Sequence, residues 1–145
     1  IAAGHVPELA GYPVLKREQK YGKNSRIDIL LEAPDRPRCF VEVKNVTMRR
    51  DIAGPAEFPD SVTERGSKHL KEMADMVRAG ARAVMFYLVQ RGDCARFAIA
   101  QDIDPVYAAS LKSAMAEGVE VLCYTAQVSP DGIHVHAPLT LDLPR

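Results

Sequence analysis

In the segment FVEVKN at residues 40–45, Glu42 and Lys44 interrupt an apolar run and stand two positions apart. Residues at i and i+2 of a β-strand lie on the same face. A strand here therefore presents the carboxylate and the ammonium group side by side, while Val41 and Val43 face the other way. An acid and a base on one face of a core strand indicate either an ion-binding, catalytic site or a solvated charged surface.

A second carboxylate falls opposite this pair if the preceding segment forms a hairpin with it. A turn centred on Asp35, in EAPDRPR, places Asp28 across from Glu42 and Arg26 across from Lys44. Opposed Cβ atoms of an antiparallel pair lie about 4.5–5.5 Å apart, so two acids in these positions repel each other. Ion pairs with the two basic residues relieve the repulsion, and so does a divalent cation between the acids. The spacing alone leaves both interpretations open.

The cation interpretation gives every polar group a role. Hard cations such as Mg2+ and Mn2+ bind one or two carboxylates together with waters and substrate phosphates. Asp28 and Glu42 are the candidate metal ligands, with the backbone carbonyl of Val43 as a third. Lys44 then positions or deprotonates a metal-bound water and stabilises charge on an attacked phosphorus. Asp28, Glu42 and Lys44 are thus the candidate catalytic residues for phosphodiester hydrolysis.

The surrounding pattern predicts an α/β fold. The apolar run 83–89 suits a central strand buried on both faces, and a capping box at Ser61 and Glu64 opens a helical apolar repeat that Gly80 can end. In chain order we predict strands at 14–20, 26–31 and 39–46, a helix between Ser61 and Gly80, a strand at 83–89, a helix at 105–117, and strands at 119–124 and 133–136. Strand–helix–strand links favour parallel pairing and the early hairpin is antiparallel, so the sheet is mixed and flanked by helices.

Length and composition are those of an ordinary globular domain. The 145 residues are 47% hydrophobic and 26% charged, which suits one domain with its own core. No apolar run reaches membrane-spanning length and no signal peptide is visible, so we expect no membrane partner. The three cysteines are far apart and form no CxxC motif, which favours a reducing cytoplasm over zinc or disulfide chemistry.

Basic residues concentrate in the first third of the chain. Residues 1–50 hold ten Lys and Arg against six Asp and Glu, although the net charge of the whole chain is zero. A local basic face can attract DNA phosphates without reading base sequence, and ordinary surface charge is the alternative. The candidate nucleic-acid contacts are Lys16, Lys20, Lys23, Arg26, Arg49 and Arg50, joined by Thr63 and Arg65 at the start of the first helix.

Four segments, in order along the chain, carry a resemblance to a known family. They are KYGKNSRIDILLE, CFVEVKNVT, FPDSVTERGSKHLKEM and IDPVYAASL. Together they make residues 11–143 resemble the bacterial sugar fermentation stimulation protein family. The D…ExK part is shared with the whole restriction-endonuclease-like, or PD-(D/E)xK, superfamily.

The resemblance implies a restriction-endonuclease-like domain that binds DNA without sequence preference and is linked to the regulation of sugar (maltose) metabolism. It places Asp28, Glu42 and Lys44 at the metal and catalytic positions, and Thr63 and Arg65 at the family's helix start. Related nucleases often add an acid from a helix before the first strand, where this chain offers only Glu8. In the family an OB-fold-like domain precedes the nuclease-like one, and we expect it to be absent from this chain.

These observations divide the chain and leave three functions open. Residues 1–11 form a lead-in, interpreted as the remnant of a preceding helix or domain, and residues 12–145 form the nuclease-like α/β domain. The protein is a DNA-binding regulator with a nuclease-type Mg2+ or Mn2+ site, an active metal-dependent endonuclease, or a non-enzymatic interaction domain. A homodimer is left open.

Overall fold

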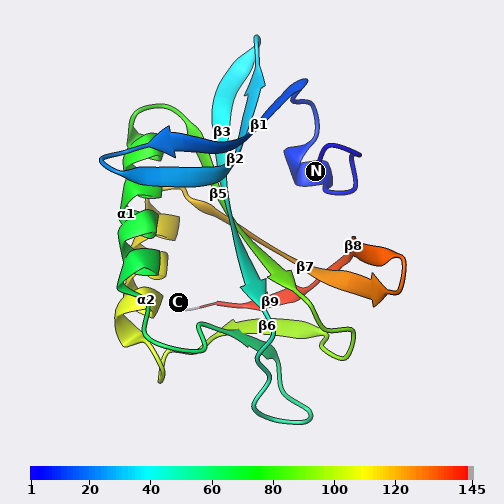
Figure 1. The fold of residues 1–145 in the computed structure, drawn as a ribbon. Coiled ribbons are helices and arrows are strands. Elements are labelled where there is room, and N and C mark those ends of the chain that lie inside the picture. Colours follow the sequence, from blue (N-terminus) through cyan, green and yellow to red (C-terminus); the bar gives the residue numbers. More distant parts are fainter. Residues whose placement is uncertain (144–145) are drawn as a thin grey trace.

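The computed structural model describes residues 1–143 and contains two β-sheets and two α-helices (Figure 1). The main sheet has six strands in the order β1-β2-β3-β5-β7-β8, and a small sheet has the order β4-β6-β9. The elements are β1 Val14–Tyr21, β2 Ser25–Ala33, β3 Arg36–Val46, β4 Ala56–Phe58, α1 Glu64–Arg78, β5 Arg82–Val89, β6 Arg96–Ile99, α2 Pro105–Ala116, β7 Glu120–Ser129, β8 Gly132–Pro138 and β9 Thr140–Asp142, with a 3-10 turn at Pro7–Leu9. The predicted mixed α/β sheet is confirmed.

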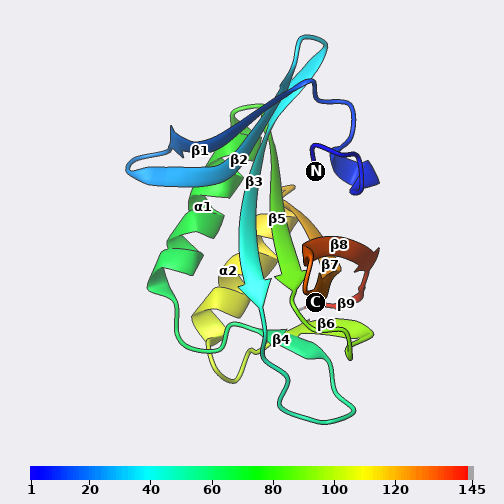
Figure 2. The same ribbon diagram turned by 45° about the vertical axis from the view of Figure 1, so that its right-hand side comes forward.

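The main sheet separates two apolar clusters. Helices α1 and α2 cover one face, where Phe40, Met85 and Tyr87 pack against Leu70 and Leu111. The N-terminal segment lies on the other face, as two views of the ribbon show (Figures 1 and 2). A side chain on β3 therefore points either toward the helices or toward the N-terminal segment.

The β2–β3 hairpin has the predicted register. Ile29 pairs with Val41, Leu30 with Phe40 and Leu31 with Cys39, so continuing the same register brings Asp28 to the level of Glu42. Strands β3 and β5 pair in parallel, as do β5 and β7, which is the arrangement expected of strand–helix–strand links.

The predicted alternation of β2 fails at Asp28. Ile27 and Leu30 both belong to the cluster under the helices, whereas Ile29 and Leu31 belong to the opposite cluster. Strand β1 is irregular at the same level, because Glu18 has a positive φ of 51° and forms no ladder pair between Arg17–Ile29 and Gln19–Ile27. A regular strand over 26–31 places residues 27, 29 and 31 on one face, but here Ile27 lies on the opposite face from Ile29 and Leu31 because the strand changes face beside Asp28.

Both helices begin at a side-chain cap. Thr63, rather than the predicted Ser61, caps α1, because its hydroxyl accepts a hydrogen bond from Gly66 N. Asp104 caps α2 by accepting from Tyr107 N, and Pro105 occupies the first turn as predicted. Within residues 1–143, neither helix has the length and hydropathy that crossing a bilayer requires.

The lead-in at residues 1–11 packs against the sheet. Val6 is fully buried and Leu9 is 2% exposed, both in the cluster behind the sheet. The carbonyl of Glu8 accepts a hydrogen bond from Arg82 at 2.8 Å. Its origin as the remnant of a preceding element stays a prediction.

Candidate metal and nucleic-acid site

Glu42 and Lys44 lie on the face of β3 that α1 covers. The Lys44 ammonium nitrogen is 3.3 Å from Glu42 Oε1, so the two side chains share a face as their spacing predicted. His69 of α1 reaches the same oxygen, with Nδ1 at 3.2 Å. Glu42 is only 4% exposed. The acid of the ExK segment is therefore a buried carboxylate held between a strand lysine and a helix histidine.

Asp28 lies directly beside this strand. Its Oδ2 accepts a hydrogen bond from the backbone N–H of Val43 at 2.7 Å. The bond joins β2 to β3 one position beyond Glu42 and fixes the Asp28 carboxylate next to the Val43 peptide. The structure therefore brings together Asp28, Glu42, Val43 and Lys44, all of the residues predicted for the metal and the chemistry.

The surroundings of Glu42 oppose its ionisation. Burial raises the pKa of the Glu42 carboxyl most strongly, the charge of Asp28 raises it further, and Lys44 and His69 lower it. Glu42 Oε1 contacts both Lys44 and His69, whereas the buried Oε2 has no hydrogen-bond partner in the described chain. An unpartnered, buried carboxylate oxygen is a ligand that a hard divalent cation accepts.

Other buried polar atoms without a partner come from the same four elements of the fold. All of those found in residues 1–143 come from β1, β2, β3 or α1, and they are Tyr21 Oη, Ser25 Oγ, Ser67 Oγ, Glu72 Oε2 and Glu42 Oε2. Across the same residues, no three His, Cys, Asp or Glu side chains gather closely enough to hold a metal by themselves. The residues fit a cation that is bound by few side chains and completes its shell with backbone and water oxygens.

The acid expected from a preceding helix lies elsewhere. Glu8 accepts a hydrogen bond from the Tyr124 hydroxyl at 2.6 Å, and its neighbours Val6 and Leu9 pack on the face of the sheet away from α1. Glu8 therefore does not join Glu42.

Glu72 of α1 is the nearby acid that sequence reasoning missed. A Cβ placed at Gly22 in the β1–β2 turn would be 3.1 Å from its carboxylate, so Glu72 reaches the hairpin. Burial raises the pKa of Tyr21, and the charges of Glu42, Glu72 and then Asp28 raise it further. The sequence signal that could have found Glu72 was helical spacing. Glu72 follows His69 by three residues and Arg65 by seven, which places the three side chains on one face of the helix.

A groove opens beside His69, between the β1–β2 hairpin and α1. Its volume is about 630 Å³, and its walls are Asn24, Ser25, Arg26, Glu64, Arg65, Lys68 and His69. A smaller pocket of about 210 Å³ at the hairpin turn includes Lys20 and Lys23. Four of the predicted nucleic-acid residues, Lys20, Lys23, Arg26 and Arg65, therefore line these two adjoining cavities.

The other predicted contacts are occupied by protein groups. Lys16 pairs with Glu32 at 2.7 Å, and Arg49 pairs with Asp93 at 2.8 Å. Arg50 bridges Glu57 at 2.6 Å and Asp102 at 2.5 Å. Thr63 is used as the cap of α1. The two arginines thus brace the loop between β3 and β4.

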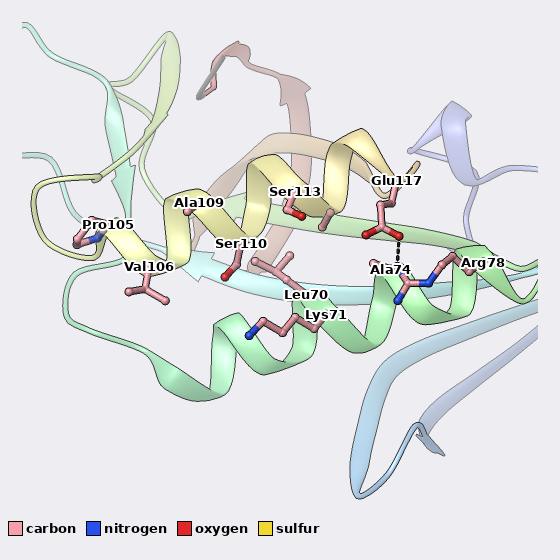
Figure 3. A pocket seen from close by; sticks show the side chains of 11 residues that line it. Leu70, Lys71, Ala74, Arg78, Pro105, Val106, Ala109, Ser110, Ser113 and Glu117 are labelled. Atoms are coloured by element: carbon pink, nitrogen blue, oxygen red, sulfur yellow. Dashed lines mark hydrogen bonds and ion pairs between the residues drawn. The ribbon is translucent and has the colours of Figure 1, made fainter.

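A second groove, between α1 and α2, contains none of the predicted site residues (Figure 3). It measures about 460 Å³, and its walls include Leu70, Ala74, Val106 and Ala109. An Arg78–Glu117 ion pair spans the two helices at one end. The charged groove beside Glu42 and this mostly apolar one are separate features of α1.

Comparison with known proteins identifies the family. The family model described as "Sugar fermentation stimulation protein RE domain" matches residues 1–132. The chain belongs to the sugar fermentation stimulation protein family. A homolog from Paramagnetospirillum magneticum is 63% identical over 143 residues, covering 99% of this chain and 60% of the relative. One from Rhodospirillum rubrum is 60% identical over 154 residues, covering 99% of this chain and 63% of the relative.

A solved structure of the family supports the fold. The structure of Pyrococcus furiosus SfsA in complex with Ca2+ matches with a TM-score of 0.84 and 30% identity, over 95% of this chain and 58% of that one. The restriction-endonuclease-like α/β fold is thus confirmed. This sugar fermentation stimulation domain spans about three-fifths of the length of the curated relatives, at 60% of the first.

Proposed function

We propose that this domain binds DNA without sequence preference and holds a divalent cation, Mg2+ or Mn2+, at Asp28 and Glu42 with the Val43 carbonyl. The observation that carries the proposal is Glu42 Oε2, a carboxylate oxygen that is buried and has no partner in residues 1–143. Burial of an unpaired ionised oxygen is costly, and a cation is the partner that removes the cost.

The metal assignment has support from a relative. The Pyrococcus furiosus protein is described in complex with Ca2+, which, like Mg2+, prefers oxygen ligands. In this chain Asp28 and Glu42 supply carboxylate oxygens, and the hydrogen bond from Val43 N orients the Asp28 carboxylate. These contacts are compatible with a cation that takes one oxygen from each acid.

The DNA assignment follows from the type of side chain near the site. Arginine and lysine groups contact phosphates and supply affinity that does not depend on base sequence. A basic groove beside a metal site can therefore hold the backbone of any duplex or single strand. By family membership we further propose a role in regulating sugar (maltose) metabolism. The three cysteines are free and buried, which supports a cytoplasmic location.

Phosphodiester hydrolysis is the second candidate function, and the contact between Lys44 and Glu42 favours it. When bound, a divalent cation supplies Lewis-acid charge and lowers the pKa of a coordinated water. Lys44 stands next to that position with an ammonium group that can hold a water or stabilise charge on the phosphate. His69 keeps the carboxylate of Glu42 in place from the opposite element.

The two candidates separate in one experiment. The domain is incubated with supercoiled plasmid and Mn2+ beside Glu42→Gln and Lys44→Met, and nicking and gel shifts are recorded at low salt. Salt-sensitive shifts without nicking support the binder, and nicking that both variants lose supports the nuclease. If no DNA is shifted or cut, this domain is neither, and the remaining alternative is a non-enzymatic interaction domain.

A further inference from the structure

The groove between the β1–β2 hairpin and α1 carries an excess of positive charge. Its walls hold Arg26, Arg65 and Lys68 against the single acid Glu64, with His69 as a further titratable group. The β1–β2 hairpin lies beside α1 (Figures 1 and 2), and residues from these two distant parts of the chain line the same groove. The side chains of Arg26, Arg65 and Lys68 therefore line one groove.

The cations of this groove are less engaged with acidic side chains than Arg49 and Arg50 are. Within residues 1–143 no acid forms an ion pair with Arg26 or Arg65, and Lys68 reaches only Glu72, at 3.8 Å. In contrast, Arg49 and Arg50 are bound to acids at 2.5–2.8 Å. A phosphate entering the groove meets available guanidinium groups, whereas at the loop it must displace carboxylates.

The groove also leads to the buried carboxylate. His69 lines the groove and places Nδ1 3.2 Å from Glu42 Oε1. Ser25 lines it too, is 4% exposed, and has a hydroxyl oxygen without a partner in the described chain. Only the His69 side chain therefore separates a group bound in the groove from the Glu42 carboxylate of the candidate metal site.

We propose that this groove, rather than the loop between β3 and β4 that contains Arg49 and Arg50, is where a backbone phosphate of DNA binds. The inference rests on the proposed function and names the place and the chemical class of its ligand. Arg26 and Arg65 supply the guanidinium donors, which match phosphate oxygens in geometry. Lys68 adds positive charge. His69 lies between the bound DNA strand and Glu42, because it lines the groove and contacts the Glu42 carboxylate. Such contacts reach phosphates and not base edges, so sequence is not read.

The test is the salt dependence of DNA binding. Affinity for a short duplex is measured by fluorescence anisotropy over a range of salt concentrations, for the wild type and for Arg26→Ala/Arg65→Ala. Each lost phosphate contact lowers the slope of log K against log salt by about 0.9 for duplex DNA. We expect the double variant to lose about two such contacts and at least about tenfold in affinity at low salt.

Control variants remove positive charge elsewhere, two charges at the loop and one on α1. Lys71→Ala changes α1 beside the apolar groove, and Arg49→Ala/Arg50→Ala changes the loop. We expect Lys71→Ala to bind with the wild-type slope, and the loop variant to lose less than the groove variant. Circular dichroism confirms that each variant is folded before binding is measured.

The outcomes distinguish the two proposals. If the wild type binds DNA and the groove variant binds with the same affinity and slope, the groove assignment is wrong while the proposed function stands. A larger loss in the loop variant than in the groove variant overturns it in the same way. If the wild type shifts no DNA at low salt, the proposed function itself fails and the groove assignment fails with it.

Discussion

At the scale of single residues, the two oxygens of Glu42 have different roles. Oε1 is contacted by Lys44 and His69, and Oε2 is buried without a partner in residues 1–143. Two contacts on one oxygen fix the rotation of the carboxylate, so the other oxygen is aimed at a defined position. A buried carboxylate oxygen without a partner destabilises the folded protein, and under the proposed function a bound cation removes that cost.

Glu42→Gln should stabilise the metal-free protein at neutral pH. The folded-state pKa of Glu42 lies above the ordinary value of 4.5 because burial disfavours the ionised form. A raised acid pKa contributes stability that is complete below the unfolded-state pKa and is lost as the pH rises through the folded-state pKa. The Tm of the variant minus that of the wild type, in EDTA, should therefore grow as the pH rises from the ordinary pKa of 4.5 through neutrality. A constant difference across this range would contradict the argument.

His69 should support metal binding through its hydrogen bond to Glu42. Replacing an outer partner of a metal ligand typically weakens metal affinity by about 10- to 100-fold. We expect His69→Leu to weaken Mn2+ binding by about tenfold or more, and His69→Asn to retain most of it, because an amide nitrogen can replace Nδ1. Isothermal titration with Mn2+ measures both.

The neighbouring core residue provides the control for His69. Leu70 is fully buried under the sheet, so Leu70→Ala should lower the Tm without changing Mn2+ affinity. If His69→Leu lowers the Tm as Leu70→Ala does but binds Mn2+ normally, the histidine only docks the helix.

At the scale of elements, the sequence predicts the long periodic parts and not the short ones. The β2–β3 register followed from one turn, and α1, α2 and β5 followed from apolar spacing and Pro105. Strands β4 and β9 have three residues each, too few for a period to be visible. The change of face at Asp28 was also invisible, since it depends on the irregular backbone opposite, at Glu18.

The sequence predicts the part of the candidate site that lies on one strand, and not the part that tertiary packing brings together. Glu42 and Lys44 lie two residues apart on one strand, so local geometry places them together. His69 and Glu72 reach the site only through the packing of α1 on the sheet, which a helical pattern does not specify. The partners of Arg49 and Arg50 come from β4 and from loops far along the chain, so their ion pairs could not be anticipated.

One carboxylate joins the starts of both helices. Asp104 is 2% exposed; its Oδ1 accepts from Tyr107 N at 2.9 Å, and its Oδ2 accepts from Thr63 N at 2.8 Å. Asp104→Ala leaves two donors without this partner and should lower the free energy of unfolding by about 2–4 kcal/mol. Thr63→Ala removes only the cap to Gly66 and should cost about 1 kcal/mol.

Urea denaturation checks the order of these two effects. Thr63→Ser keeps the hydroxyl and should stay close to the wild type, which separates the cap from general packing. Equal losses in Asp104→Ala and Thr63→Ala would show that Asp104 does not link the helices.

At the scale of the whole molecule, the main sheet separates the face that carries the candidate site from the face that residues 1–11 cover. The candidate site and the charged groove lie on the side of α1, and residues 1–11 cover the other side. Three contacts join these residues to the sheet: Arg82 with the Glu8 carbonyl, Tyr124 with the Glu8 carboxylate, and Arg36 with the Ala10 carbonyl at 3.0 Å. The segment therefore belongs to the core of this domain.

Leu9→Ala should accordingly destabilise the domain without affecting the site. Leu9 is 2% exposed, and truncating a buried leucine costs about 2–5 kcal/mol through lost burial and the cavity left behind. Ile52→Ala, at a side chain that is 92% exposed, is the control and should change stability by less than about 0.5 kcal/mol. Because the sheet lies between Leu9 and Glu42, Mn2+ and DNA affinities of the folded Leu9→Ala variant should equal those of the wild type. Equal free energies of unfolding for the two variants would show that the lead-in does not stabilise the domain. Altered Mn2+ or DNA affinities in Leu9→Ala would show that the two faces of the sheet are coupled through β3.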